Sequence, residues 1–490
     1  MTSFEKLWRP GPAKLKAQTA PGSDSASGDK FLYLLILCPL AALIFFFGGA
    51  RPWIWQGVTG LFFLCLGAWH FRFRVSPPDK RLRGLLIIGL CFLLVPLLQI
   101  IPLPLALLET LSPVRGQWAR TLLELGNISS TTISYEPLAT WMRLAWWLFL
   151  LTFAVLLAQA LNSGRAKYPV WLLHSLFVLA GLEAIYGILQ ALLPGLGVLW
   201  NMDPQTGLAY KGSARGTFIN RNHYAAFLGL LWPVLLAYVL ILKSPRKMEH
   251  VLGKRAQAQV LVQQKVFAVF CLALVILGLV LSQSRGGILG ALLSFTLLYL
   301  FAGLRQKRVT AALFACWIIM LGYGTIIGFD DISNRFSQIG QGATVRVEIW
   351  KDGWNAVRDH PLTGTGLGTY PSVGRAYQNA FSPQLRAHHA HNDYLEAVVE
   401  MGLPAAGILI LGIWALWCSR AFFLWRKRQT MDPDRLVLAA GSLAALGGYL
   451  LHSWVEFNNA IPANQLTAIM VAIFHIHISR ENTDQAGQTD

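Results

Sequence analysis

Three arginines in this 490-residue chain have the positions that binding of a phosphate would need. Arg285 stands in LSQSRGGILG, where one apolar run ends and the next begins. Arg215 and Arg221 stand in SARGTFINRNHYAAF, just before another apolar run. Guanidinium groups bind phosphate oxygens with paired hydrogen bonds, so these residues could form a cationic clamp. The alternative is that their side chains reach lipid head groups.

A histidine-rich segment, RAHHAHNDYLEAVVEMGLPAAG, supplies a candidate base. Apolar side chains follow His391 at the third, fourth and seventh positions, which predicts one face of a helix. They are Tyr394, Leu395 and Val398. A neighbouring face carries Asp393, Glu396 and Glu400. A histidine on such a packed face can act as a general base, although a hydrogen-bonded structural role is the alternative.

A metal site is the other chemistry that this segment suggests. His388, His389 and His391 could bind a metal with Asp393, but no zinc-binding spacing such as HExxH is present. We therefore expect no metal and no cofactor.

The segment before it, ATVRVEIWKDGWNAVRDH, predicts an amphipathic helix that carries Arg346. Gly364, Gly366 and Gly368 follow, without a preceding strand and with prolines on both sides. They predict turns and not a phosphate-binding loop.

The elements that position these residues belong to a membrane protein. Residues of the set AVILMFWYC make up 54% of the chain and charged residues 13%, whereas soluble proteins carry about 25% charged residues. A single soluble enzyme domain is therefore excluded. The net charge is +17, but the basic residues lie between apolar runs. This indicates membrane topology and not nucleic-acid binding.

Twelve apolar segments approach the length of a transmembrane helix, about 20 residues. They are 31–49, 53–70, 84–103, 137–161, 169–193, 223–243, 266–284, 286–304, 309–328, 403–424, 436–456 and 465–479. The distribution of Lys and Arg places both termini in the cytoplasm by the positive-inside rule. The predicted fold class is an all-α polytopic membrane protein with one large periplasmic loop containing short helices.

The predicted organisation has five parts. They are a disordered cytoplasmic tail at 1–30, nine spans within 31–328, a periplasmic catalytic loop at 329–402, three spans within 403–479 and a cytoplasmic tail at 480–490. A smaller outer loop, 104–136, is expected to hold a helix lying on the membrane surface.

Several ionisable residues lie inside the predicted spans and suggest a proton relay. They are Arg143, His174, Glu183, His452 and Glu456, and the sequence does not bring them together. The pair His475 and His477 is expected at the inner membrane interface.

Four motifs together resemble the O-antigen ligase and polymerase superfamily of bacterial membrane glycosyltransferases. They are SRGG, RGTFINRNHYAAFL, VRVEIWKDGW with HPLTGTGLGTY, and HAHNDYLEAVVEMGL, and the similarity covers roughly residues 200–425. The ligase pattern is His, Asn or Ser, nine residues and Gly, which His391, Asn392 and Gly402 match. Ala405 stands where ligases have Gly, Thr or Tyr. Ligase and polymerase therefore remain alternatives.

The resemblance implies a metal-independent, GT-C-like enzyme of the bacterial inner membrane with its active site facing the periplasm. Its donor would be a glycan on undecaprenyl pyrophosphate, and its acceptor lipid A-core or another glycan. Arg215 and Arg285, assisted by Arg221, would hold the pyrophosphate. His391 would correspond to the essential loop histidine of the family.

The chemistry of these residues agrees with that implication. A glycosyl pyrophosphate is already activated, so the enzyme must stabilise the departing charge and deprotonate an acceptor hydroxyl. The arginines can do the first, and His391 can do the second with inversion of the anomeric centre. Asn392, Asp393 or Glu396 would orient the imidazole, with Arg346 in the same loop. A transporter of lipid-linked sugars is less favoured, because the informative residues lie at outer span ends and in one loop.

Overall fold

A computed structural model describes residues 23–72, 83–126, 131–163, 165, 167–193, 195–200, 211–242, 255–303, 311, 314–315, 317–318, 340–378 and 387–480. Every regular element within these ranges is a helix. The helices are α2 (Ser23–Phe45), η2 (Phe47–Gly49), α3 (Pro52–Arg72), α4 (Arg83–Ile100), α5 (Leu105–Leu111), α6 (Pro113–Glu124), α7 (Pro137–Asn162), α8 (Lys167–Leu192), α9 (Arg221–Ile241), α11 (Arg255–Leu281), α12 (Arg285–Ala302), α14 (Gly340–Asp359), α15 (Tyr370–Ala376), α16 (Asp393–Lys427), α17 (Pro433–His452), η5 (Asn458–Ala460) and α18 (Pro462–Ile478).

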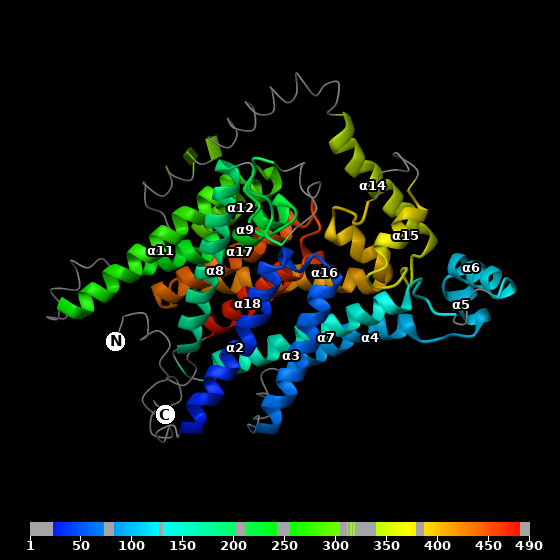
Figure 1. The fold of residues 1–490 in the computed structure, drawn as a ribbon, viewed down its shortest axis with the longest axis horizontal. Coiled ribbons are helices and arrows are strands. Elements are labelled where there is room, and N and C mark those ends of the chain that lie inside the picture. Colours follow the sequence, from blue (N-terminus) through cyan, green and yellow to red (C-terminus); the bar gives the residue numbers. More distant parts are fainter. Residues whose placement is uncertain are drawn as a thin grey trace.

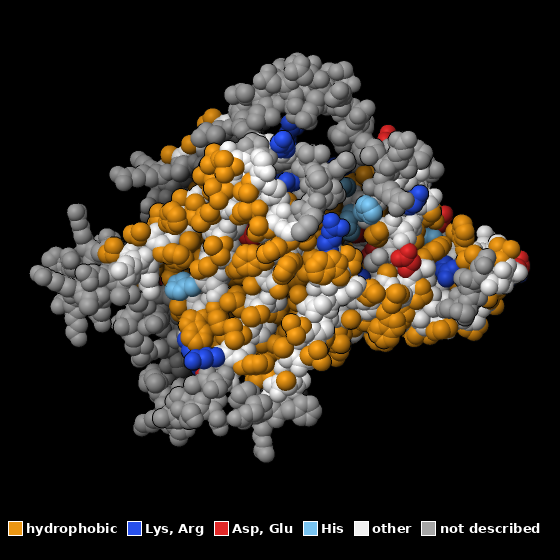
Figure 2. Space-filling model, in the orientation of Figure 1, with side chains coloured by type: hydrophobic (Ala, Val, Ile, Leu, Met, Phe, Trp, Pro, Cys, Tyr) orange, Lys and Arg blue, Asp and Glu red, His pale blue; other side chains and the backbone are white. Residues whose placement is uncertain are grey.

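Long helices form the body of the molecule, and α5, α6, α14 and α15 lie toward one end of it (Figure 1). On the face shown in Figure 2, hydrophobic side chains cover the long helices almost continuously. Most charged side chains on this face lie toward the side of α14, α5 and α6. This distribution is typical of a protein whose body lies in lipid.

Within the described residues, eight helices are long and apolar enough to cross a membrane, namely α2, α7, α8, α9, α11, α12, α16 and α17. Each contains most of one predicted span. The segments 84–103 and 465–479 correspond to shorter apolar helices, and 53–70 corresponds to α3, a 21-residue helix outside these eight. The segment 309–328 lies almost entirely outside the described residues. The all-α polytopic class is confirmed, whereas the count of twelve spans and the orientation of the termini stay predictions.

Two local predictions were wrong. The expected surface helix in 104–136 is two helices, α5 and α6, because Ser112 has extended backbone angles (φ −146°, ψ 81°) and Pro113 starts a new helix. The disordered tail expected at 1–30 is too long, because α2 begins at Ser23. The helix of the first span therefore extends several residues before its apolar run begins. Residues 1–22 and 481–490 lie outside the described ranges.

Close packing of α17 against α9 and α12 brings the ends of these three helices together. A Cβ atom on Gly441 would lie 2.8 Å from the carbonyl oxygen of Pro233 in α9. One on Gly448 would lie 2.6 Å from the carbonyl oxygen of Gly290 in α12. Small residues allow helix backbones to approach this closely. The starts of α9 and α12 therefore lie near the end of α17.

The boundary predicted between the large loop and the next span falls at a break in α16. Gly402 has φ 78° and ψ 163°, so α16 consists of two helical parts joined there. A Cβ atom on Gly402 would lie 2.4 Å from the carbonyl oxygen of Leu362. The turn residues Gly364, Gly366 and Gly368 all have positive φ. The prediction of turns is confirmed, and these turns pack on the first part of α16.

Candidate active site

His391 lies immediately before α16 and not on it. Its φ is +49°, in the left-handed region, and Asn392 is the N-cap. The Asn392 side-chain oxygen accepts hydrogen bonds from the backbone N–H groups of Tyr394 (3.0 Å) and Leu395 (3.1 Å). The predicted helical face starting at His391 is therefore wrong, because a left-handed residue cannot continue an α-helix. This turn directs the imidazole toward the segment after α17.

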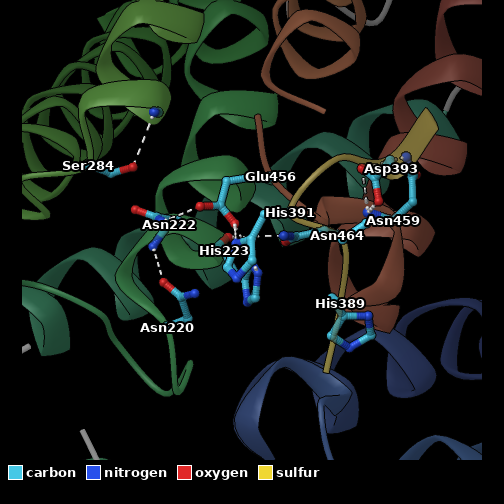
Figure 3. Close-up of polar contacts among 12 residues, drawn as sticks. Asn220, Asn222, His223, Ser284, His389, His391, Asp393, Glu456, Asn459 and Asn464 are labelled. Carbon is cyan, nitrogen blue, oxygen red and sulfur yellow. Dashed lines mark hydrogen bonds and ion pairs between the residues drawn. The ribbon is translucent and has the colours of Figure 1, made fainter. Parts of the chain in front are cut away.

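Glu456, in that segment, is the residue on which the site converges (Figure 3). Nδ1 of His391 lies 3.4 Å from its Oε2. Nδ2 of Asn222 donates to its Oε1 at 2.6 Å, and Nη2 of Arg346 lies 2.5 Å from the same oxygen. Nε2 of His223 lies 3.9 Å from Oε2. Residues from α9, α14 and the loop before α16 thus meet at one carboxylate.

The environment of Glu456 keeps this carboxylate ionised. Its side chain is buried, with 1% of the residue exposed. Burial raises the pKa, but the hydrogen bond with His391 and nearby positive charges, including that of Arg346, outweigh it and lower the pKa of Glu456 to about 2. An anion held between cationic partners can accept a hydrogen bond from imidazole over the whole neutral range.

The aromatic ring of Phe457 lies against the imidazoles of three histidines in this site. Phe457 stacks on His389 with ring centroids 4.3 Å apart. It meets His391 and His223 edge to face, at centroid distances of 4.8 and 4.4 Å. One side of the candidate base is therefore covered by an apolar group.

Two of the predicted arginines lie at helix starts beside this site. Arg221 is the first residue of α9, and its Nη1 donates to Oε1 of Gln283 at 3.4 Å. Arg285 is the first residue of α12 and is exposed, and Ser284 caps the helix. A Cβ atom on Gly286 would lie 2.9 Å from Nε2 of His452, so α12 starts against the end of α17. Helix N-termini carry partial positive charge, so both positions favour an anion.

Arg215 lies deeper in the loop before α9. The residue is 6% exposed, and its backbone N–H donates to Oε1 of Gln190 in α8 at 3.2 Å. Thr217 donates through its backbone N–H and its hydroxyl to the buried Glu183, both at 2.9 Å. The loop that carries Arg215 is thus fixed on α8.

The three residues expected to orient the imidazole make other contacts. Asn392 caps α16, as described above. The Asp393 carboxylate accepts hydrogen bonds from the backbone and side-chain N–H groups of Asn459 at 3.0 to 3.1 Å. Glu396 contacts Nδ1 of His389 at 2.8 Å. These contacts fix the loop, and the carboxylate that contacts the His391 imidazole is that of Glu456.

Sequence reasoning missed Glu456, Asn222 and His223 as parts of this site. The sequence presents Glu456 as an acidic residue within a predicted span, but nothing in the sequence connects it with His391. Asn222 and His223 stand in the motif that carries Arg221. The polar residues of that motif were the available signal.

A metal ion has no obvious set of ligands here. Among the described residues, no three His, Cys, Asp or Glu side chains lie close enough together to hold one. His389 faces Glu396, whereas His391 faces Glu456. The histidines of this segment therefore point to separate partners.

Comparison with known proteins agrees with the motifs. The family model described as O-antigen ligase matches residues 269–411, a range that includes Arg285, Arg346 and His391. The exopolysaccharide production protein ExoQ of Rhizobium meliloti (strain 1021) is 31% identical over 119 residues, which are 23% of this chain and 26% of that protein. The match thus spans about a quarter of the relative's length. Residues 269–411 of this chain therefore match the model of the O-antigen ligase family, in agreement with the resemblance of the motifs.

Proposed function

We propose that this protein is a membrane glycosyltransferase that moves a glycan from undecaprenyl pyrophosphate to an acceptor hydroxyl. The acceptor is lipid A-core or another glycan, and the reaction takes place at the periplasmic face of the bacterial inner membrane. The observation that carries the proposal is the contact of His391 with the ionised Glu456, beside arginines at the starts of α9 and α12. The family of residues 269–411 supports the same class of reaction.

His391 is the base in this proposal. The Nδ1–H group donates to Oε2 of Glu456, which leaves the lone pair on Nε2 for the substrate, as in hydrolase triads. Nε2 takes the proton of the acceptor hydroxyl while the hydroxyl oxygen attacks the anomeric carbon. The bond from that carbon to the pyrophosphate oxygen breaks, and undecaprenyl pyrophosphate leaves with the electron pair. Attack from the opposite face inverts the anomeric centre.

Fixed positive charge stabilises the leaving pyrophosphate. Arg285 and Arg221 stand at helix starts, and Arg346 lies at the Glu456 carboxylate. Charge that is already in position costs no reorganisation when negative charge develops on the leaving group. Arg215 would contribute from within the loop before α9.

A polymerase is the second candidate. The name of the relative in Rhizobium meliloti associates it with exopolysaccharide production, which favours another glycan as the acceptor. A lipid-linked sugar transporter is a weaker alternative, because the polar residues of the site gather at helix ends and not at mid-span.

Reconstitution separates these functions. Purified protein would be incubated with lipid-linked glycan and either lipid A-core or a second lipid-linked glycan, and the products identified by mass spectrometry. Glycan on lipid A-core indicates a ligase, and a longer lipid-linked glycan indicates a polymerase. Movement of unchanged lipid-linked sugar across vesicles without a new covalent product would contradict the proposal.

Replacing Arg285 with alanine should lower kcat by about 10²–10³-fold, as loss of one charge-stabilising group typically does. Single-turnover transfer by purified variants measures the effect. Arg358→Ala, at the exposed end of α14, is the matched control and should retain wild-type rates. A rate for Arg285→Ala within twofold of the wild type would remove Arg285 from the leaving-group site.

Removal of divalent metal should leave transfer unchanged, because arginines supply the positive charge in this scheme. Initial rates would be compared in EDTA and in added Mg²⁺. Strict dependence on Mg²⁺ would contradict the proposed role of the arginines.

A further inference from the structure

A cavity of about 590 Å³ lies between α4, α7, α16, α17 and α18. Its walls are mostly large apolar side chains from these helices. They include Trp147, Leu409, Ile413, Leu443, Ile469 and Ile473. The lining residues of α16 lie between Asp393 and Arg420, on both sides of the break at Gly402. An apolar space of this kind suits an aliphatic chain.

The two ends of this cavity differ in charge. At the start of α16 the lining is rich in carboxyl groups, with Arg143 and His389 among them. These carboxyl groups belong to Asp393, Glu396 and Glu400. The opposite end is lined by Arg420 and His475. An anionic head group is therefore favoured at the Arg420 end.

Three arginines gather at the Arg420 end, and we call Arg420, Arg435 and Arg480 the basic cluster. Nη2 of Arg420 donates to the Ser479 hydroxyl at 2.5 Å. Arg435 donates to the carbonyl oxygens of Ile478 (3.1 Å) and Arg480 (2.7 Å). These partners of Arg420 and Arg435 are neutral oxygens. Nη1 of Arg480 donates to Oδ1 of Asn162 at 2.5 Å. Asp432, which contacts the backbone N–H of Arg435, supplies one negative charge nearby.

Two buried polar atoms at this end need further partners. Nε of Arg420 is buried without a hydrogen-bond partner. His475 is 2% exposed, and its Nδ1 lies 3.0 Å from the carbonyl oxygen of Ala439. That carbonyl can only accept, so the proton is on Nδ1, and Nε2, which also lacks a partner, is an acceptor. An anionic oxygen could accept a hydrogen bond from Nε of Arg420, and a hydroxyl group could donate one to Nε2 of His475.

We propose that this end of the cavity binds an anionic phospholipid of the phosphatidylglycerol type. Its phosphodiester lies on the basic cluster, a head-group hydroxyl donates to Nε2 of His475, and one acyl chain enters the cavity. Basic pockets between transmembrane helices bind anionic head groups in this way. The site lies at the opposite end of α16 from His391 and does not depend on the glycosyltransferase proposal.

The test uses the purified, delipidated full chain and measures retained lipid by native mass spectrometry. The probes are phosphatidylglycerol and phosphatidylcholine with the same acyl chains. The wild type should retain phosphatidylglycerol preferentially, and Arg420→Gln should bind it about fivefold more weakly, the effect of one lost charge at a lipid head group. Arg426→Gln is the matched control, because that guanidinium lies over the Phe422 ring at 5.7 Å and does not line the cavity.

A second variant tests the chain-binding part separately. Ala472 lines the cavity, so Ala472→Phe should fill it and weaken phosphatidylglycerol binding while leaving every charge in place. This variant keeps the test decisive even if Arg420→Gln fails to fold.

Three results would overturn the proposal. They are equal retention of both lipids by the wild type, equal weakening by Arg420→Gln and Arg426→Gln, and thermal stabilisation by inorganic phosphate alone as large as that by phosphatidylglycerol. The last result would indicate an anion site without a lipid chain.

Discussion

The His391→Ala variant should transfer glycan about 10²–10⁴-fold more slowly than the wild type, the usual contribution of general base catalysis. The imidazole is the group placed to take the acceptor proton, with Nδ1 held by Glu456. Alanine removes the base and leaves the arginines at α9 and α12 in place. Donor binding should therefore change little, and the loss should appear in kcat.

His388→Ala is the control for this variant, because His388 is exposed in the same loop. It should keep wild-type transfer. Added imidazole should restore part of the activity of His391→Ala, since a small base can enter the space that the side chain leaves. Wild-type transfer by well-expressed His391→Ala protein would remove His391 as the base.

The Glu456→Gln variant should lower kcat by about 10²–10⁴-fold, the range seen when the group that orients a functional histidine is changed. Glutamine keeps the size of the side chain but removes the charge that holds His391 and Arg346. Its amide can present an N–H group to Nδ1, which favours the wrong tautomer of the imidazole. Single-turnover kinetics would separate this effect from donor binding.

The pH dependence of Glu456→Gln provides a second readout. The pKa of Glu456 is about 2 in the folded protein and about 4.3 in an unfolded chain. A lowered pKa stabilises the fold above the unfolded value, and this contribution is lost as the pH falls through the folded value. The difference in Tm between wild type and variant should therefore be constant between roughly pH 5 and 8 and shrink below about pH 4.

Glu109→Gln is the control, because Glu109 forms a more exposed ion pair with Arg120 in the α5–α6 segment. It should leave transfer unchanged. A Tm difference for Glu456→Gln that varies between roughly pH 5 and 8 would show that this carboxylate titrates there, contrary to its environment.

Local sequence signals predicted much of the helical framework. Apolar length located the eight long helices, since each apolar run must be covered by lipid or protein along its whole length. The boundary at Gly402 and the turns at Gly364, Gly366 and Gly368 were also predictable, because glycine there allows positive φ. Apolar spacing does not predict the break at Ser112, because that spacing continues across Pro113, where the second helix starts.

The candidate site was predictable only in part. The motifs named the arginines and His391, and the family match includes Arg285, Arg346 and His391. The helical face assigned to His391 was wrong, because apolar spacing contains no information about the left-handed turn at that residue. Nearness in sequence favours Asn392, Asp393 and Glu396 as orienting groups, whereas their side chains contact other groups.

The sequence by itself determined the membrane class, the long helices, the turn glycines and the match of residues 269–411 to the O-antigen ligase family model. These properties depend on composition and on patterns a few residues apart. Only the tertiary structure decided that Glu456 meets His391, which lies 65 positions away in the chain. That contact requires α17 to pack closely on α9 and α12 through glycines, and it requires the chain to turn at His391. Backbone approach and side-chain direction are products of packing, so no local pattern could have encoded them.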